Sequence, residues 1–303
     1  MRRFRSCAKL NLHLEVVGRR DDGFHELRTI FQTIDLADEI ELEPLATGGE
    51  VRLEVFGADL PTDERNLAVR AARAFLDAWG RPGEGVAIRL RKRIPAGAGL
   101  GGGSANAATV LEGMGVVFDR TPDAGWLRIA ASRLGADVSF FLVGGTAIGL
   151  GRGDRLIALA DPPGGAVELW LAIPPYPLST AAVYAAFVAP PHEPPPRPPL
   201  AGLLAGSSPA GWPELIGNND LEHAAFALRP ELGALYTALA SSGARRIRLS
   251  GSGSTLFALY DDPVAARRAT RALPPGTAWQ RVSTLGREAW RAACGLPPSD
   301  GEG

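Results

Sequence analysis

Residues 95–104 read Pro-Ala-Gly-Ala-Gly-Leu-Gly-Gly-Gly-Ser and run directly into Ala-Asn-Ala-Ala-Thr-Val-Leu, residues 105–111. Glycines let the backbone approach a ligand closely and adopt positive φ. The residues that follow predict a helix from Ser104 to about Gly115. The unpaired N–H groups and the dipole at the start of a helix favour an anion. The stretch therefore predicts a phosphate-binding loop, for which a polyphosphate is the natural ligand.

Other glycine-rich motifs fit this stretch less well. A P-loop ends in Gly-Lys-Ser/Thr, and no lysine stands in the run of glycines before Ser104. The pattern G-x-G-x-x-G does occur at Gly97, Gly99 and Gly102, but a dinucleotide fold begins with a continuously apolar strand, whereas residues 86–94 alternate. A purely structural turn would cost conformational entropy for no packing. Phosphate binding is the preferred interpretation.

The lysines point the same way. Only two occur, Lys9 and Lys92, against thirty arginines. An ammonium is a compact point charge that fits against a phosphoryl oxygen, whereas a guanidinium is larger and suited to forked contacts. Each lysine lies beside a sequence motif that indicates phosphate binding. Both are therefore candidates for phosphate chemistry, and the alternative is that their placement is due to chance.

Residues 95–108 resemble the central ATP-phosphate motif of the GHMP kinases, the small-molecule kinases named after galactose, homoserine, mevalonate and phosphomevalonate. Ala-Lys-Leu-Asn-Leu at 8–12 resembles the family's first motif, and Leu-Ser-Gly-Ser-Gly-Ser-Thr-Leu-Phe at 249–257 resembles its third. The three motifs occur in the family's order. The resemblance therefore covers nearly the whole chain.

Three shorter segments resemble the members of the family that act on a cytidine diphosphate-linked polyol. They are Arg-x-Asp-Gly-Phe-His at 20–25, Asn-Leu at 66–67 and Gly-Ala-Asp-Val at 135–138. One residue departs from the pattern, because Ser139 stands where the family usually has proline. The resemblance implies an ATP-dependent kinase that phosphorylates a hydroxyl group of such a small molecule. The alternatives are another kinase of the family, acting on homoserine or a sugar, and a nucleotide-binding protein without catalysis.

The resemblance also implies the fold, an α+β, two-domain GHMP-kinase fold. Its N-terminal part is a ribosomal-protein-S5-like nucleotide-binding domain, and its C-terminal part is a ferredoxin-like α/β sandwich. We place the ATP-binding and catalytic domain at residues 1–161, the substrate-binding domain at 162–295 and a frayed tail at 296–303. The proline-rich residues 190–199 predict a stiff exposed insertion, with a ligand for a proline-binding module as the alternative.

The periodicity of the apolar residues agrees with a mixed fold. It predicts strands at 10–16, 30–34, 39–45, 86–94, 167–173 and 247–260, and helices at 67–79, 104–115, 126–134 and 221–240, the last interrupted at Pro230.

The resemblance assigns the catalytic pair to Lys9 and Asp137. Asp137 would remove or align the proton of the acceptor hydroxyl, and Lys9 would neutralise and orient both that carboxylate and the transferring phosphoryl group. From the residues alone, Asp137 also fits a helix cap after Gly135, and Lys9 an outward position on an edge strand. The ATP contacts that the resemblance implies are Asn66, Lys92, Pro95, Gly97, Gly99, Leu100, Gly101, Gly102, Gly103, Ser104 and Asn106.

Asn11 lies two residues from Lys9 on the same face of a strand, and the resemblance assigns it to the polyol. Phe24, His25 and Tyr184 resemble a pocket in which aromatic faces sandwich cytosine and His25 bonds to the edge of the base. Thr180, Gly251 and Ser252 complete the implied substrate site. Ordinary alternatives exist for several of these residues: core aromatics, a structural histidine, a helix cap at Asn66, a solvated Lys92 and a tight hairpin at 250–255.

Magnesium is implied by ATP chemistry, with Ser104 as its candidate protein contact, although no dense carboxylate cluster marks a site. The formal net charge of −1 gives no overall attraction to nucleic acid or to a membrane. Cys7 and Cys294 are far apart in sequence and lack metal-ligand spacing, and no targeting or membrane-spanning segment is visible. We therefore expect a small-molecule enzyme of the reduced cytoplasm, a monomer or weak homodimer.

Overall fold

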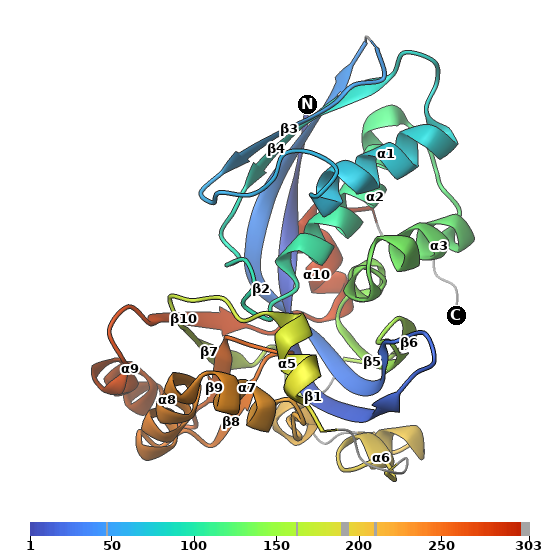
Figure 1. Ribbon diagram of the computed structural model, residues 1–303. Coiled ribbons are helices and arrows are strands. Elements are labelled where there is room, and N and C mark those ends of the chain that lie inside the picture. The colour runs from blue at the N-terminus through green and yellow to red at the C-terminus, as the bar shows by residue number, and fades with distance from the viewer. Residues whose placement is uncertain (47, 162, 189–193, 209–210, 298–303) are drawn as a thin grey trace.

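The computed structural model describes residues 1–46, 48–161, 163–188, 194–208 and 211–297 (Figure 1). Two β-sheets form its framework, one in each half of the chain. None of the helices in these ranges is long and apolar enough to cross a membrane.

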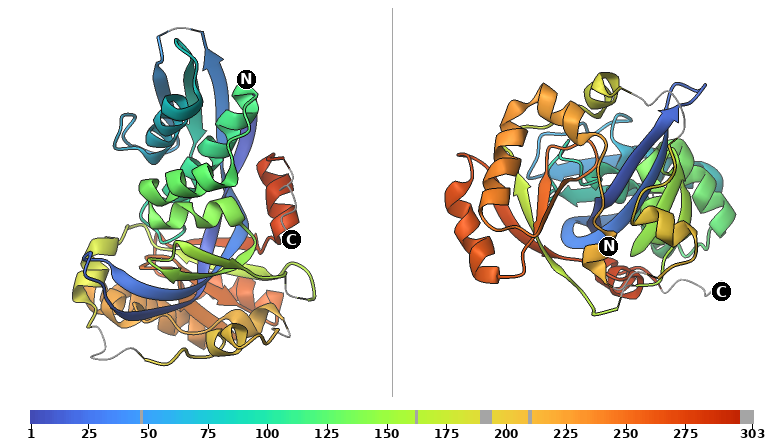
Figure 2. Two further views of the ribbon diagram at one scale, coloured as in Figure 1. Left: turned by 90° about the vertical axis from the view of Figure 1, so that its right-hand side faces the viewer. Right: turned by 90° about the horizontal axis from the view of Figure 1, so that it is seen from below.

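The N-terminal sheet is built around a long antiparallel hairpin of β1 (Arg2–Arg19) and β2 (His25–Leu45). The other edge of β2 has two partners: β4 (Gly85–Arg91) pairs with residues 39–45, and β5 (Thr146–Gly151) with residues 27–32. Strands β3 (Val51–Phe56) and β6 (Arg155–Ala158) lie outside these. The hairpin therefore passes from one end of the sheet to the other, and Figure 2 shows it reaching beside the C-terminal half.

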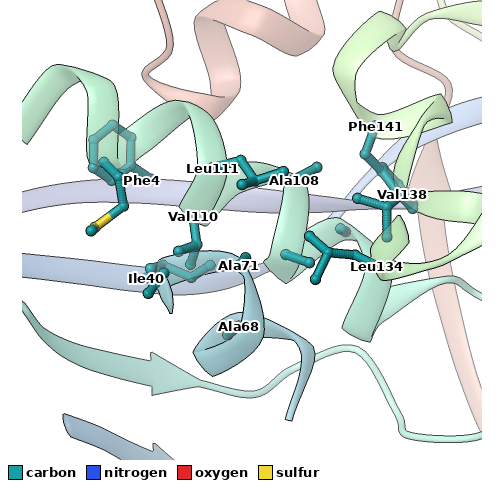
Figure 3. Packing of buried hydrophobic residues seen from close by; sticks show 14 of the residues in the cluster. Phe4, Ile40, Ala68, Ala71, Ala108, Val110, Leu111, Leu134, Val138 and Phe141 are labelled. Atoms are coloured by element: carbon teal, nitrogen blue, oxygen red, sulfur yellow. The ribbon is translucent and has the colours of Figure 1, made fainter. Parts of the chain in front are cut away.

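Helices α1 (Leu67–Trp79) and α2 (Gly102–Phe118) pack on this sheet, and α3 (Ala124–Leu134) packs against both helices. The predicted limits of α1 are confirmed, and Asn66 is its cap, since its Oδ1 accepts from the Ala68 N–H at 3.0 Å. Helix α2 is longer than predicted at both ends, because its packing outweighs the low helix propensity of its glycines. Figure 3 shows Val110 and Leu111 of this helix within the apolar cluster.

The C-terminal sheet has the strand order β10 (Ala278–Ser283), β7 (Glu168–Ile173), β9 (Leu256–Leu259) and β8 (Arg246–Leu249), all antiparallel. Counted along this half of the chain the order is 4-1-3-2, with helices between strands 1 and 2 and between strands 3 and 4, which confirms the ferredoxin-like prediction. The helices are α5 (Thr180–Ala186), α6 (Leu200–Leu204), α7 (Glu222–Leu228), α8 (Pro230–Ser241) and α9 (Pro263–Ala269). The predicted break at Pro230 separates α7 from α8.

The two sheets share a core. Leu171 and Phe257 of the C-terminal sheet pack with Leu10, Ile30 and Ile148 of the N-terminal sheet, all of them fully or almost fully buried. The two halves of the fold are thus held together by an apolar contact, and this contact fixes the position of β1 relative to β9.

Two parts of the chain differ from expectation. Helix α10 (Arg287–Cys294), which we assigned to the C-terminal part, packs on β1, where Cys294 Sγ lies 3.7 Å from Cys7 Sγ as a free thiol. Of the predicted exposed insertion, residues 194–199 are described, and they are not free of the protein: the Arg197 N–H donates to Glu15 Oε1 at 2.7 Å. Pro195 and Pro198 are exposed, as predicted, whereas Arg197 is half-buried because the buried Glu15 carboxylate binds it. Residues 190–193 of the insertion, and 298–303 of the tail, lie outside the described residues, and the domain limits stay predictions.

Candidate active site

A cavity of about 430 Å³ lies where the glycine-rich loop, β1, α5 and the loop before β9 meet. Most of the residues predicted from sequence line it, and they come from positions 9 to 252 of the chain. These residues are Lys9, Asn11, Asn66, Lys92, Pro95, Gly97, Gly99, Leu100, Gly101, Gly102, Gly103, Ser104, Asn106, Asp137, Thr180, Tyr184, Gly251 and Ser252. Phe24 and His25 are not among its lining residues.

The glycine-rich loop is held by its carbonyl groups. Four consecutive carbonyl oxygens, those of residues 97–100, accept hydrogen bonds from other segments. The donors are Leu178 N at 3.1 Å, Thr255 N at 3.2 Å, Ser250 Oγ at 2.9 Å and Lys9 N at 3.0 Å. Because β1 and the C-terminal half take these carbonyls, the third motif fixes the shape of the second.

Glycine is required at two positions of this loop. A Cβ atom on Gly99, which has φ of +77°, would lie 2.1 Å from the Ser250 carbonyl oxygen. Gly101 begins α2 with φ of +70°, and a Cβ there would lie 3.0 Å from Cγ of Lys9. No side chain caps α2, so the N–H groups of residues 102–104 are open to a ligand. A close backbone approach and an uncapped helix start suit a polyphosphate.

Lys9 and Asp137 meet at the cavity. Lys9 Nζ lies 3.4 Å from Asp137 Oδ2 and donates to Asn11 Oδ1. Asp137 lies in the short helix η1 (Ala136–Val138), and fully buried Val138 anchors it to the core shown in Figure 3. The Asp137 side chain is 36% exposed and caps neither of the helices beside it. The cap alternative therefore fails, and the carboxylate is free to contact a ligand.

Tyr184 connects this pair to the other end of the cavity. Burial, and next the negative charge of Asp137, raise the pKa of the Tyr184 hydroxyl. The His25 ring stacks on Tyr184, with 4.9 Å between ring centroids and 28° between planes. Burial, and next the positive charge of Arg19, lower the pKa of His25, which favours the neutral ring. A base that stacks on Tyr184 would have to displace the His25 ring from this face.

Phe24 lies outside this stack. Its side chain is 54% exposed, and the Arg152 guanidinium lies 5.2 Å from its ring centroid. Arg152 itself lines the cavity and was not predicted. Thr180 Oγ1 lies 2.8 Å from Ser252 Oγ, and this contact joins α5 to the loop of the third motif.

Lys92 belongs to a closed network. Its Nζ donates to Asp38 Oδ2, and to Asn106 Oδ1 at 3.2 Å. Asp38 also accepts from Asn106 Nδ2 at 2.9 Å and from the N–H groups of Arg93 and Ile94 at 2.7 and 2.8 Å. Asp38 is fully buried and was missed by sequence analysis, because no motif surrounds it. The contacts of Lys92 and Asn106 with ATP stay predictions, since here the two bind each other and Asp38.

The described ranges contain no group of three or more His, Cys, Asp or Glu side chains that could hold an ion. Ser104, in the first turn of α2, lines the cavity beside the open N–H groups. A magnesium ion that arrives with the phosphates of ATP suits this arrangement better than an ion held by the protein alone.

Comparison with known proteins agrees with the site. The model of the GHMP kinase N-terminal domain matches residues 66–145, and that of the C-terminal domain matches residues 201–275. The 4-diphosphocytidyl-2-C-methyl-D-erythritol kinase of Thermus thermophilus is 44% identical over 92% of this chain and 94% of its own. The chain belongs to this family of GHMP kinases. The kinase of the same name from Moorella thermoacetica is 42% identical over 86% of this chain and 90% of its own.

Solved structures place the chain in the same kinase family. A crystal structure of 4-(cytidine 5'-diphospho)-2C-methyl-D-erythritol kinase superimposes with a TM-score of 0.75 at 39% identity, covering 94% of this chain and all of the other. Homoserine kinase from Cytophaga hutchinsonii has a TM-score of 0.69 at 19% identity, over 95% of each chain. The second likeness shows the fold alone. ATP-dependent phosphoryl transfer is thus the activity of this family.

Proposed function

We propose that the chain transfers the γ-phosphoryl group of ATP to the 2-hydroxyl of 4-diphosphocytidyl-2-C-methyl-D-erythritol. The products are the 2-phosphate and ADP, in the non-mevalonate route to isoprenoid precursors. One observation carries the proposal: the Lys9–Asp137 pair and the uncapped start of α2 face the same cavity. A hydroxyl and a phosphoryl group can therefore meet there.

Phosphoryl transfer depends on placement and on stabilisation of negative charge. The open N–H groups of residues 102–104 suit the phosphates of ATP, which supplies the phosphoryl group when bound. Lys9 is only 4% exposed, and a cation in such a poorly solvated position acts strongly on a nearby phosphoryl oxygen. Lys9 thus has both the charge and the position to stabilise the group in transfer.

The acceptor hydroxyl must be aligned and must lose its proton. Asp137 offers free acceptor capacity within 3.4 Å of Lys9, so a hydroxyl between the carboxylate and the phosphates can donate to it. As the new O–P bond forms, the bond to the leaving phosphate breaks and the proton passes to the carboxylate. Asn11, bonded to the same ammonium, lies where it can hold the polyol.

We assign the cytidine end of the substrate to Tyr184 and His25, whose rings stack on each other. A base stacked on an aromatic ring gains about 1–3 kcal/mol. Binding energy from such a remote part of the substrate can be used to align the reacting groups. Phe24 would complete the sandwich if its exposed ring turns toward the base.

The remaining assignments follow from this reaction. Magnesium would accompany ATP, with the Ser104 hydroxyl as its protein contact. The net charge of −1 suits a small-molecule partner in the cytoplasm better than nucleic acid or a membrane surface. The oligomeric state, a monomer or a weak homodimer, stays a prediction.

The test is ADP release by purified protein with ATP, magnesium and the diphosphocytidyl substrate, with homoserine as the control alcohol. We expect turnover that requires the cytidine substrate, and that falls about a hundredfold or more in Asp137→Asn. Turnover of homoserine or a sugar instead would support a sister kinase. ATP binding without turnover of any alcohol would support a non-catalytic protein.

A further inference from the structure

Thr29 lies in β2 beside Asn11 and lines the cavity, although no sequence motif marks it. Its side chain is almost fully buried, with 1% exposure. We propose that Thr29 is a positioning residue that fixes which way the Asn11 amide faces, and through it holds the ammonium of Lys9. The proposal rests on the function proposed above for Asn11 and Lys9.

The direction of each hydrogen bond can be worked out from the groups involved. Thr29 Oγ1 lies 2.7 Å from the His13 carbonyl oxygen, which can only accept. The single hydroxyl hydrogen of Thr29 therefore points to His13. Asn11 Nδ2 lies 2.8 Å from the same Oγ1, which is left to act as acceptor. Thr29 can therefore bind the NH₂ side of the amide and not its oxygen.

This fixes the other side of the amide. With Nδ2 on Thr29, Oδ1 of Asn11 faces Lys9 Nζ and accepts from it. A flipped amide would direct its NH₂ group at the ammonium, so two donors would face each other. Lys9 would then keep Asp137, 3.4 Å away, and the Phe31 ring, whose centroid lies 5.5 Å from Nζ, as its partners among the described residues. Thr29 thus keeps Asn11 as a second partner of the Lys9 ammonium, beside the Asp137 carboxylate that aligns the acceptor hydroxyl.

Two substitutions separate this role from simple packing. Thr29→Val keeps the shape and removes the hydroxyl, whereas Thr29→Ser keeps the hydroxyl and removes a methyl group. That methyl packs near Gly149, where an added Cβ would lie 3.0 Å from it. The proposal predicts a kcat lowered about tenfold or more in Thr29→Val, with an unchanged KM for ATP, and near wild-type kcat in Thr29→Ser. A packing role predicts the opposite order and would overturn the proposal.

A double-substitution cycle tests whether Thr29 acts through Asn11. In an Asn11→Ala background, Thr29→Val should cause no further loss of kcat, because the amide that it orients is absent. A full tenfold loss in that background would overturn the proposal.

The two lysines allow a test that needs no turnover. Protein labelled with ¹³C at the lysine ε-carbon gives two lysine signals, one from Lys9 and one from Lys92. Thr29→Val should shift the Lys9 signal and leave that of Lys92, which is bound to Asp38, as the internal reference. Thr29→Ser should leave both. If Thr29→Val unfolds and moves both signals, Thr29→Cys, with its weakly bonding thiol, replaces it.

An unmoved Lys9 signal in the folded variant overturns the inference whichever alcohol the enzyme phosphorylates. Absence of turnover by the wild-type protein with the cytidine substrate would instead refute the proposed function, and it would leave the lysine spectrum unaffected. The two failures are therefore distinguishable.

Discussion

Two lysine–aspartate pairs lie at the same cavity and have different surroundings. Lys9 and Lys92 are alike, each with a side chain 5% exposed. Their partners differ: Asp137 is 36% exposed and keeps acceptor capacity, whereas Asp38 is fully buried and accepts from four donors. A carboxylate with free lone pairs can receive a substrate hydroxyl, and a saturated one cannot. The same residue types therefore form a reaction centre in one place and a structural clamp in the other.

Lys92→Met should produce the largest effect, and it should be on stability. Removing the ammonium leaves the Asp38 charge buried without its cation, which costs about 3–5 kcal/mol. We expect a clearly lower urea midpoint, with kcat of the folded protein within tenfold of wild type. Equilibrium unfolding and turnover in the absence of urea measure the two quantities. An unchanged midpoint with lost turnover would reverse the comparison.

Lys9→Met should affect the reaction instead. Water can solvate the partly exposed Asp137 carboxylate after the change. The free energy of unfolding should therefore fall by less than about 1 kcal/mol. Loss of a cation that stabilises the transferring phosphoryl group should lower kcat by about 10²–10³-fold. Saturation kinetics of Lys9→Met beside Lys92→Met makes the matched measurement. A Lys9→Met protein with wild-type kcat would remove Lys9 from the reaction.

The difference between the two pairs was only half visible in the sequence. The glycine-rich motif and its order relative to the segments at 8–12 and 135–138 led to Lys9 and Asp137, because residues that touch the ligand carry the family's motifs. Asp38 acts on the protein itself, and its role arises from the pairing of β2 with β4 and from the packing of α2 on β2. Such a role depends on contacts between distant segments, which no local pattern shows.

The fold was predictable to a similar degree. The spacing of apolar residues predicted α1, because one face of that helix is buried. Pro230 predicted the break between α7 and α8, because proline lacks the N–H group that a continuous helix needs. It did not predict the return of α10 to β1 or the binding of Arg197 by Glu15, since both depend on partners that are distant in sequence.

Glu112 sharpens the comparison, because it is a buried acid with a single donor. Its Oε1 accepts from Arg291 at 3.1 Å, and its Oε2 has no partner. Burial raises the pKa of Glu112 to about 7, and Arg291 offsets only part of the rise. The folded protein therefore holds a proton that the unfolded chain has lost above its ordinary pKa of 4.5.

The sign of the pH effect follows from this difference. The contribution of Glu112 to stability is full below pH 4.5 and is lost as the pH rises to about 7. Wild type should lose at most ~1.4 kcal/mol per pH unit relative to Glu112→Gln, which cannot titrate. Urea midpoints of both proteins at several pH values measure this slope. Parallel curves would show that Arg291 keeps Glu112 charged throughout this pH range.

His25 gives the smallest effect and tests the proposed cytidine end. Its neutral ring offers one donor and one acceptor to the edge of a base, and protonation removes the acceptor. Because burial and the charge of Arg19 lower the pKa of His25 below 6.5, the KM for the cytidine substrate should stay flat at neutral pH and rise only at pH values below 6.5. His25→Ala should raise that KM about tenfold at neutral pH, the value of one hydrogen bond, with little change in kcat. Initial rates across this pH range, with ATP saturating, measure both. A His25→Ala protein that loses kcat instead would place the histidine near the reacting groups, and the division between a remote binding end and a Lys9–Asp137 reaction centre would have to be given up.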